Sequence, residues 1–269
     1  GKQPIDLVYR VWVQRGEMTA ADANRLSADV SDPPRVAVSN VKPAGKKPAK
    51  KKRAGKNSPL RQVANDPTLP RVLLIGDSIS IGYTLPLRVA LKGQANVHRP
   101  ATNCGPTTRG ISQLDKWLGS GAWDVIHFNW GIHDLTHLNA SGKVAPPPEG
   151  KPQVPLNEYR RNLRELLGRL RRTGARLIWA STTPVGSKVE AKGFRRNGEV
   201  IAYNEAAGEL LKGENLRTND LYSLVKPQAE RCLSDGVHFT RHGEAVLAKA
   251  VAQTIQNSLA DQKQAGSKE

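Results

Sequence analysis

Runs of aliphatic residues alternate with amphipathic segments from residue 71 onward. Residues 71–76 read Arg-Val-Leu-Leu-Ile-Gly, and similar apolar runs occur within 124–129 and 175–180. Continuous apolar runs of this length are typical of strands that are buried on both faces of a parallel sheet. A weaker strand is predicted at 96–98 and a last short one at 216–221.

Helices are predicted between these strands. Apolar side chains within 156–172 recur at the spacing of one helix face, namely at Tyr159, Leu163, Leu166, Leu167 and Leu170. Further helices are predicted at 81–92, 111–118, 198–211 and 243–259. Strands that alternate with helices predict a three-layer α/β/α sandwich with a central parallel sheet. Functional sites in such folds lie in the loops at the carboxyl ends of the strands.

The first 69 residues differ in composition from the rest of the chain. A short helical unit is predicted within 1–32, and a disordered linker rich in proline and lysine at 33–69. The α/β domain is predicted at 70–260, with a long surface loop at 140–155, and a flexible tail at 261–269.

Positive charge is concentrated in the linker. The 269-residue chain has a formal net charge of +17. Eight positive charges with no acid among them fall between Val41 and Lys56, namely Lys42, Lys46, Lys47, Lys50, Lys51, Lys52, Arg53 and Lys56. We interpret this run as a solvated, self-repelling segment rather than a specific nucleic-acid site. The remaining +9 would attract an anionic substrate such as an anionic polysaccharide.

The apolar runs and the cysteines limit the cellular setting. No apolar run approaches the ~20 residues of a membrane-spanning helix. We expect a secreted or periplasmic protein whose signal peptide is absent from this chain, which begins at Gly1. Two cysteines, Cys104 and Cys232, are too few for a disulfide scaffold and form no C-x-x-C pair.

The first strand runs into Gly76-Asp77-Ser78, which a predicted helix follows. A serine at a strand end and a helix N-terminus exposes its hydroxyl, and the free N–H groups of the first turn can face a developing oxyanion. Asp77 can cap or brace the turn. Since aspartate and serine are also ordinary capping residues, this motif alone leaves a structural role open.

A second polar element, Asp235-Gly236-Val237-His238, precedes the last predicted helix. An aspartate three residues before a histidine can accept the Nδ1 proton and leave Nε2 free to take a proton from serine. A helix-capping turn with an incidental histidine is the alternative. Together with an exposed serine at the first strand, the pair predicts a Ser78–His238–Asp235 triad.

Two more elements follow strand ends. Gly105 lies in Asn103-Cys104-Gly105-Pro106, where a glycine can bring a backbone N–H close to a substrate oxygen. His133 lies in Gly131-Ile132-His133-Asp134 and can donate an imidazole N–H. A metal site formed by His133 and His137 is a minor alternative, because a strand-to-loop transition does not assure that both face one ion.

In this order the four elements resemble the sequence blocks of SGNH (GDSL-like) hydrolases, over roughly residues 71–259. The family's Gly-Asp-Ser, its block II glycine and its Asp-x-x-His match Ser78, Gly105, Asp235 and His238. The third block usually reads Gly-x-Asn-Asp, so His133 stands in place of asparagine and Asp134 matches the aspartate. Supporting resemblances are Asn204, Asp220, Leu221 and Tyr222.

The resemblance implies an SGNH/flavodoxin-like fold and a serine hydrolase that acts on ester bonds. It implies Ser78 as nucleophile, His238 as base and Asp235 as its orienting partner, with no metal or organic cofactor. The oxyanion hole would consist of Ser78, Gly105 and His133, with Asp77 and Asp134 in support. If the blocks flank one site, a disulfide between Cys104 and Cys232 would also fit an oxidising compartment.

We therefore predict an esterase that hydrolyses O-acyl groups, chiefly acetyl, on a carbohydrate through an acyl-enzyme intermediate. Arg109 and Trp130 are candidate substrate contacts, and Trp117 and Tyr83 are compatible with sugar binding. The alternatives are a lipid esterase or acyltransferase with the same triad, or a non-catalytic glycan-binding module that kept the fold. The remaining histidines, His98, His127 and His242, are predicted to be structural.

Overall fold

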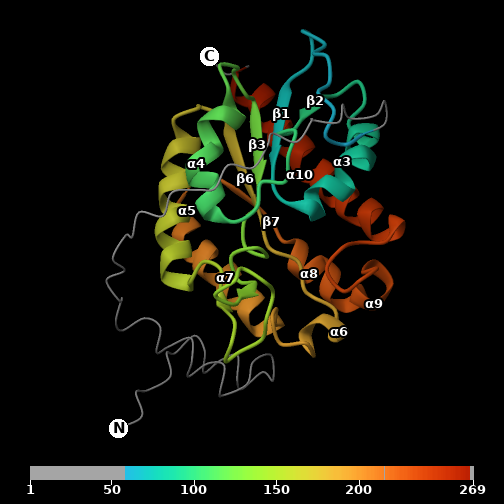
Figure 1. The fold of residues 1–269 in the computed structure, drawn as a ribbon. Coiled ribbons are helices and arrows are strands. Elements are labelled where there is room, and N and C mark those ends of the chain that lie inside the picture. Colours follow the sequence, from blue (N-terminus) through green and yellow to red (C-terminus); the bar gives the residue numbers. More distant parts are fainter. Residues whose placement is uncertain (1–57, 215, 267–269) are drawn as a thin grey trace, which may run out of the picture.

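The structure is a computed structural model, which describes residues 58–214 and 216–266 (Figure 1). The helical unit predicted within 1–32 lies outside the described residues, as does most of the predicted linker at 33–69.

A five-stranded parallel sheet forms the centre of the fold, in the order β2-β1-β3-β6-β7 (Figure 1). Its strands are β1 (Arg71–Ile75), β2 (Asn96–His98), β3 (Val125–Phe128), β6 (Arg176–Ala180) and β7 (Arg217–Asn219). Ile75 pairs with Phe128, and Phe128 with Trp179, so the three central strands end side by side. The predicted three-layer sandwich is confirmed.

Helices cover both faces of the sheet (Figure 1). One face is covered by α4 (Thr107–Leu118), α5 (Leu156–Arg171) and α7 (Asn197–Leu211), and the other by α3 (Ser78–Ala90) and α10 (Arg241–Gly266). Side chains alternate along each strand. In β1, Leu73 and Ile75 therefore pack in the α4/α5/α7 core, while Val72 and Leu74 pack in the α3/α10 core.

Shorter elements complete the fold. They are a two-stranded hairpin of β4 (His137–Leu138) and β5 (Lys151–Pro152), the helices α6 (Ser187–Glu190), α8 (Leu221–Val225) and α9 (Ala229–Cys232), and a 3₁₀ turn at Lys226–Gln228. The segment 140–155, predicted as a long surface loop, thus contributes β5. None of the described helices is long and apolar enough to cross a membrane.

The end of the predicted linker lies along the edge strand β2. The side chain of Asn96 accepts a hydrogen bond from the Asp66 backbone N–H at 2.9 Å and donates to the carbonyls of Asp66 at 2.8 Å and Leu69 at 2.9 Å. Farther along, Gln62 donates to the carbonyl of Arg99. Residues 58–69 are therefore held beside β2 through the Asn96 side chain and through the carbonyl of Arg99, which follows the strand.

The prediction of a disulfide between Cys104 and Cys232 is wrong. Both cysteines are free and buried. Cys104 packs in the core under α4, α5 and α7, whereas Cys232 packs in the core under α3 and α10. The sheet separates the two thiols, so they cannot approach within bonding distance without unfolding one face.

Both thiols should remain reduced and unreactive until the chain unfolds. Burial raises the pKa of the Cys104 thiol to about 11, which suppresses the reactive thiolate. We expect titration with a thiol reagent to detect both cysteines in denaturant without reductant, and to react slowly with the folded protein. Cys232→Ala serves as the one-thiol control. Loss of both thiols in the unreduced, denatured protein would contradict the assignment.

Candidate active site

The turn after β1 presents Ser78 as the first residue of α3. Asp77 caps this helix by accepting the N–H of Ile79 at 2.9 Å, while its own carbonyl accepts the Ser80 hydroxyl at 2.8 Å. A Cβ on Gly76 would lie 2.9 Å from that same hydroxyl oxygen, so the tight turn requires glycine. The local sequence thereby fixes the direction of the Ser78 side chain.

Three side chains form a continuous hydrogen-bonded path. Nε2 of His238 lies 2.9 Å from Oγ of Ser78, and Nδ1 lies 2.7 Å from Oδ2 of Asp235. The side chains of His238 and Asp235 are 50% and 58% exposed. The predicted residues thus meet at one open site, in the geometry in which a serine can transfer its proton to imidazole.

A closed turn before α10 holds the aspartate and the histidine. The second carboxylate oxygen of Asp235 accepts the backbone N–H groups of Val237 at 2.9 Å and His238 at 2.7 Å. Gly236 has a φ of 89° and accepts the N–H of Gly186, and a Cβ there would lie 2.6 Å from Val189. Burial tends to raise the pKa of Asp235, but the hydrogen bonds from His238 and Val237 lower it to about 2. The carboxylate therefore stays ionised at neutral pH.

Two backbone N–H groups are predicted oxyanion donors. Within the described part of the chain, the N–H of Ser78 donates no hydrogen bond. The N–H of Gly105 instead donates to Oδ1 of Asn103 at 2.8 Å. Gly105 has a φ of 62°, and a Cβ there would lie 3.2 Å from the side chain of Arg109. Glycine suits this position both by conformation and by space.

His133 is half-buried, and its ring nitrogens make no hydrogen bond to any residue that the structure describes. Burial lowers the pKa of His133, the charge of Asp77 opposes this shift, and the positive charges of Arg195, His238 and Arg109 reinforce it. A neutral imidazole carries one N–H donor. His133 is therefore chemically able to donate a hydrogen bond to a ligand.

Asp134 has a structural part in the site. Its Oδ1 accepts the backbone N–H of Thr107 at 2.9 Å and the Thr107 hydroxyl at 2.5 Å. This carboxyl joins the loop after β3 to the first residue of α4. It therefore fixes the loop that carries His133 relative to the loop that carries Gly105.

Two of the aromatic residues considered for sugar binding are buried. Trp130 is 1% exposed and packs among Phe128 and the helices α4 and α5, because the strand end turns it into the core. Tyr83 is 2% exposed in the core under α3 and α10. The prediction that Trp130 contacts substrate is therefore wrong, and Tyr83 has no access to a sugar. Trp117 is half-buried at the edge of the core.

His137 and His127 are both buried and contact residues of the protein interior. His137 bonds with Glu199 at 2.9 Å and with the carbonyl of Gly150 at 3.2 Å, so it is committed to a buried contact away from His133. His127 is buried in β3 beside Asn219, and burial lowers its pKa to about 4. Among the described residues, no three His, Cys, Asp or Glu side chains gather as metal ligands.

Arg195 was not predicted from the sequence. This half-buried residue follows α6, and its Nε donates to the Thr136 hydroxyl at 2.7 Å. Burial lowers the pKa of Arg195, whereas the charges of Asp77 and Asp235 raise it, which places the guanidinium within electrostatic reach of the triad. It lies in an irregular loop without periodicity or motif, so no sequence pattern distinguishes it from a surface arginine.

Asn204 and Asp220, which the sequence resemblance singled out, support the same edge of the sheet. The Asn204 amide accepts the N–H of Thr182 at 2.7 Å and donates to its carbonyl at 2.8 Å. Asp220 caps α8 and accepts the hydroxyl of Ser181 at 2.9 Å. Gly131 is needed here because a Cβ would lie 2.2 Å from the Thr182 hydroxyl oxygen. These contacts fix the strand ends against one another.

Replacing Asp134 with asparagine should change how stability depends on pH. Burial raises the pKa of Asp134 from 3.8 to about 7 despite the hydrogen bonds from Thr107. A carboxyl that binds its proton more tightly in the folded state loses stability as pH rises from about 4 to about 7. We expect Asp134→Asn to remove this loss, up to about 4 kcal/mol at pH 8, in urea unfolding.

Asp115, which is exposed on α4, supplies the matched control. Asp115→Asn should alter the unfolding free energy by less than about 1 kcal/mol, with the pH dependence of the unmodified chain. Parallel pH profiles for the unmodified chain and Asp134→Asn would show that Asp134 is ionised in the folded state as it is in the unfolded one.

Comparison with known proteins places these features in a family. The model of the GDSL-like lipase/acylhydrolase family matches residues 74–246. No curated protein matches. A lipase/acylhydrolase from Enterococcus faecalis has a similar structure, with 17% identity, a TM-score of 0.57 and coverage of 70% of this chain and 96% of that one.

Two further solved structures have the same fold. A putative platelet activating factor from Streptococcus pneumonia is 23% identical, with a TM-score of 0.57 and coverage of 70% of this chain and 84% of that one. Axe2, an acetylxylan esterase from Geobacillus stearothermophilus, is 17% identical, with a TM-score of 0.57 and coverage of 69% and 94%. At these identities the structural likeness concerns the fold, while the family model covers most of the chain. The chain belongs to the GDSL-like lipase/acylhydrolase (SGNH) family and is an ester-hydrolysing serine hydrolase.

Proposed function

We propose that this chain removes O-acyl groups, chiefly acetyl, from a carbohydrate, with Ser78 as the nucleophile. The hydrogen-bonded path from Asp235 through His238 to Ser78 carries the proposal, since both of its links lie within 2.9 Å. A non-catalytic glycan-binding module would have no need of this alignment.

The reaction takes two steps. Oγ of Ser78 attacks the ester carbonyl carbon while Nε2 of His238 takes the hydroxyl proton, and Asp235 stabilises the imidazolium. The tetrahedral intermediate collapses, His238 gives the proton to the departing sugar hydroxyl, and an acyl-Ser78 remains. A water molecule then attacks with His238 as base, which releases the carboxylic acid and restores the serine. No step of this mechanism uses a metal or an organic cofactor.

Three donors would stabilise the oxyanion, namely the N–H of Ser78, the N–H of Gly105 and the ring of His133. The Ser78 N–H is available, since it donates to no described residue. The Gly105 N–H now donates to Asn103, so the oxyanion would replace that amide oxygen as acceptor. His133 has no competing partner within the described residues, which supports its use in place of the asparagine usual in the family.

The surroundings of the triad favour a polar substrate. The half-exposed side chains of Asp235 and His238 can be reached by a group attached to a polymer. Among the described residues, the large hydrophobic side chains exposed at the surface are Leu85, Val89 and Val144. Leu85 and Val89 lie farther along α3, seven and eleven residues after Ser78, and Val144 lies between β4 and β5. A long acyl chain would therefore find little apolar surface there. The acetylxylan esterase named among the similar structures acts on an ester of this kind.

Positive charge beside His133 favours an anionic carbohydrate. The charges of Arg195 and Arg109 both bear on this imidazole. An anionic group next to the scissile ester would be attracted to them. We therefore propose an acylated, negatively charged polysaccharide as substrate, and a secreted or periplasmic location stays a prediction.

Replacing Ser78 with alanine should abolish hydrolysis. We expect the unmodified chain to hydrolyse p-nitrophenyl acetate and acetylated xylan, and to prefer acetyl to octanoyl esters. Because Ser78 supplies the attacking oxygen, Ser78→Ala should lower kcat by at least about 10³-fold. Release of nitrophenolate and of acetate measures the two rates.

Ser223 is exposed on α8 and provides a serine control. Ser223→Ala should keep the rate of the unmodified chain. Hydrolysis that persists in Ser78→Ala would remove Ser78 as nucleophile, and a clear preference for octanoyl esters would instead favour the lipid esterase alternative.

The role of His133 can be tested by comparing asparagine and alanine at this position. Loss of one oxyanion donor typically lowers kcat by about 10²–10³-fold, so we expect the kcat of His133→Ala to fall by that factor. His133→Asn should retain most activity, since its amide can donate in the same direction. Steady-state kinetics on p-nitrophenyl acetate separates kcat from KM, and an alanine variant as active as the unmodified chain would make His133 a bystander.

A further inference from the structure

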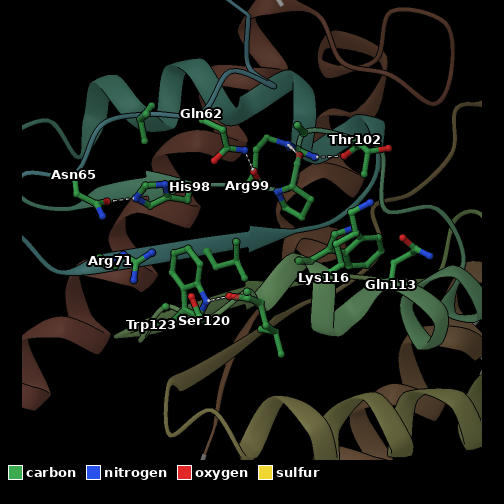
Figure 2. Close-up of a pocket in the computed structure, with 18 of the residues that line it drawn as sticks. Gln62, Asn65, Arg71, His98, Arg99, Thr102, Gln113, Lys116, Ser120 and Trp123 are labelled. Carbon is green, nitrogen blue, oxygen red and sulfur yellow. Dashed lines mark hydrogen bonds between the residues drawn. The ribbon is translucent and has the colours of Figure 1, made fainter. Parts of the chain in front are cut away.

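A groove of about 770 Å³ runs along the outer edge of the sheet, beside β2. Gln62, Val63 and Asn65 form one wall, and β1, β2 and the residues that follow β2 form the floor. The other wall is formed by α4 and the loop that precedes β3 (Figure 2). We call it the basic groove. Its volume lies within the range of small-molecule and oligomer binding sites.

Positive charge dominates this groove. Three cationic side chains line it with charge that a ligand can reach, namely Arg71, Arg109 and Lys116, and no aspartate or glutamate is among its described lining residues. Arg99 also lines the groove, but it is buried, and its guanidinium donates to Ser80, Thr84 and the carbonyl of Gly76. Two carboxylates lie near the groove without lining it: Asp115 pairs with Arg169 at 2.8 Å, and Asp124 accepts the backbone N–H of Arg71 at 2.8 Å. A concave surface that carries charge of one sign concentrates the field on whatever enters it.

The basic groove is preorganised at its far end. The guanidinium of Arg71 lies 4.2 Å from the ring centre of Trp123, and its Nη1 donates to the carbonyl of Ala122 at 2.8 Å. His98 lies edge-on to the same ring and bonds with Asn65 at 2.6 Å. Burial lowers the pKa of His98, and the charges of Arg71 and Arg88 lower it further, as expected where the local potential is positive.

One face of α4 supplies the exposed part of the groove. Arg109, Gln113 and Lys116 are four and three residues apart and line it together (Figure 2 labels the last two). This spacing places side chains on a single helix face. Across from them, Gln62 and Asn65 add exposed amides that can donate and accept hydrogen bonds (Figure 2).

The groove leads to the proposed catalytic centre. Arg109 donates to the Thr102 hydroxyl at 3.0 Å, and both line the groove. On the other side, the Arg109 side chain would lie 3.2 Å from a Cβ on Gly105, and its charge bears on His133. Arg109 is therefore shared between the groove and the site that holds the ester.

We propose that the basic groove binds the chain of an anionic polysaccharide, through its carboxylate or sulfate groups, so that an acylated sugar reaches Ser78. The inference rests on the proposed esterase function and adds a binding site for the polymer away from the triad. Continuity with an ester-hydrolysing centre favours a polysaccharide over a nucleic acid, which carries no O-acyl ester for Ser78 to cleave.

The test reverses one charge inside the groove and one outside it, in the full chain carrying Ser78→Ala. Lys116→Glu places a carboxylate in the groove, while Lys249→Glu makes the same change on the exposed side of α10. Binding of polygalacturonate, dextran sulfate and neutral dextran is measured by calorimetry. The lysine-rich residues 41–56 contribute equally to both variants, so the comparison removes their effect.

We expect Lys116→Glu to weaken binding of at least one anionic polymer by about five- to tenfold at low salt, and by much less at 0.5 M NaCl, because exposed charges are screened. Lys249→Glu should change the affinity for the anionic polymers less than about twofold, and neutral dextran should bind neither variant. A larger loss of affinity for polygalacturonate would identify carboxylate as the recognised group, and a larger loss for dextran sulfate would identify sulfate.

Equal affinities of the two variants for both anionic polymers would overturn the groove as a binding site. An unstructured RNA that binds more tightly than either polymer and loses the same factor in Lys116→Glu would assign the groove to nucleic acid and overturn the proposal as well. The rate of the unmodified chain on p-nitrophenyl acetate tests the esterase function separately, so failure of one does not imply failure of the other.

Discussion

The hydrogen bond of 2.9 Å between His238 and Ser78 joins residues that lie 160 positions apart in the sequence. Ser78 begins α3, and His238 lies in the turn just before α10, so this bond can form only because the two helices pack together on one face of the sheet. Gly82 of α3 faces Glu244 of α10, since a Cβ there would lie 2.7 Å from the glutamate's carboxylate oxygen. The position of His238 relative to Ser78 thus depends on the core under α3 and α10.

A second constraint acts on the opposite face of the sheet. Asp134 accepts two hydrogen bonds from Thr107 and so ties the loop after β3 to the start of α4. Because Arg109 lies on α4, the same contact also positions Arg109, whose charge acts on His133 and whose side chain lines the basic groove. Burying this carboxyl raises its pKa to about 7 and so costs stability at neutral pH. That cost is understandable if the gain is a fixed relation between two loops of the site.

Local signals predicted much of this arrangement. The apolar runs predicted β1, β3 and β6, and weaker signals predicted β2 and β7. The motifs around Ser78 and His238 placed both residues at one edge, where the structure brings them within hydrogen-bond distance. The helix starts were less certain: α3 begins at Ser78 rather than at 81, because Asp77 caps it. Trp130 and Cys104 were misread for a shared reason. Proximity to a motif along the chain does not reveal which face of the sheet a side chain occupies.

Arg195 and the basic groove lay beyond the reach of sequence patterns because each depends on segments that meet only in three dimensions. The groove combines residues 62–65, β2 and α4, and the first of these belongs to a segment whose composition predicted a linker. Its described lining residues include arginine and lysine but no aspartate or glutamate, while the nearby Asp115 pairs with Arg169 outside it. Such an imbalance opposes folding slightly, since like charges repel, and so is not explained by stability. An anionic polysaccharide in the groove would neutralise that repulsion and hold its acyl esters beside Ser78. The same positive charges would then both strengthen binding of the polysaccharide and orient it for hydrolysis.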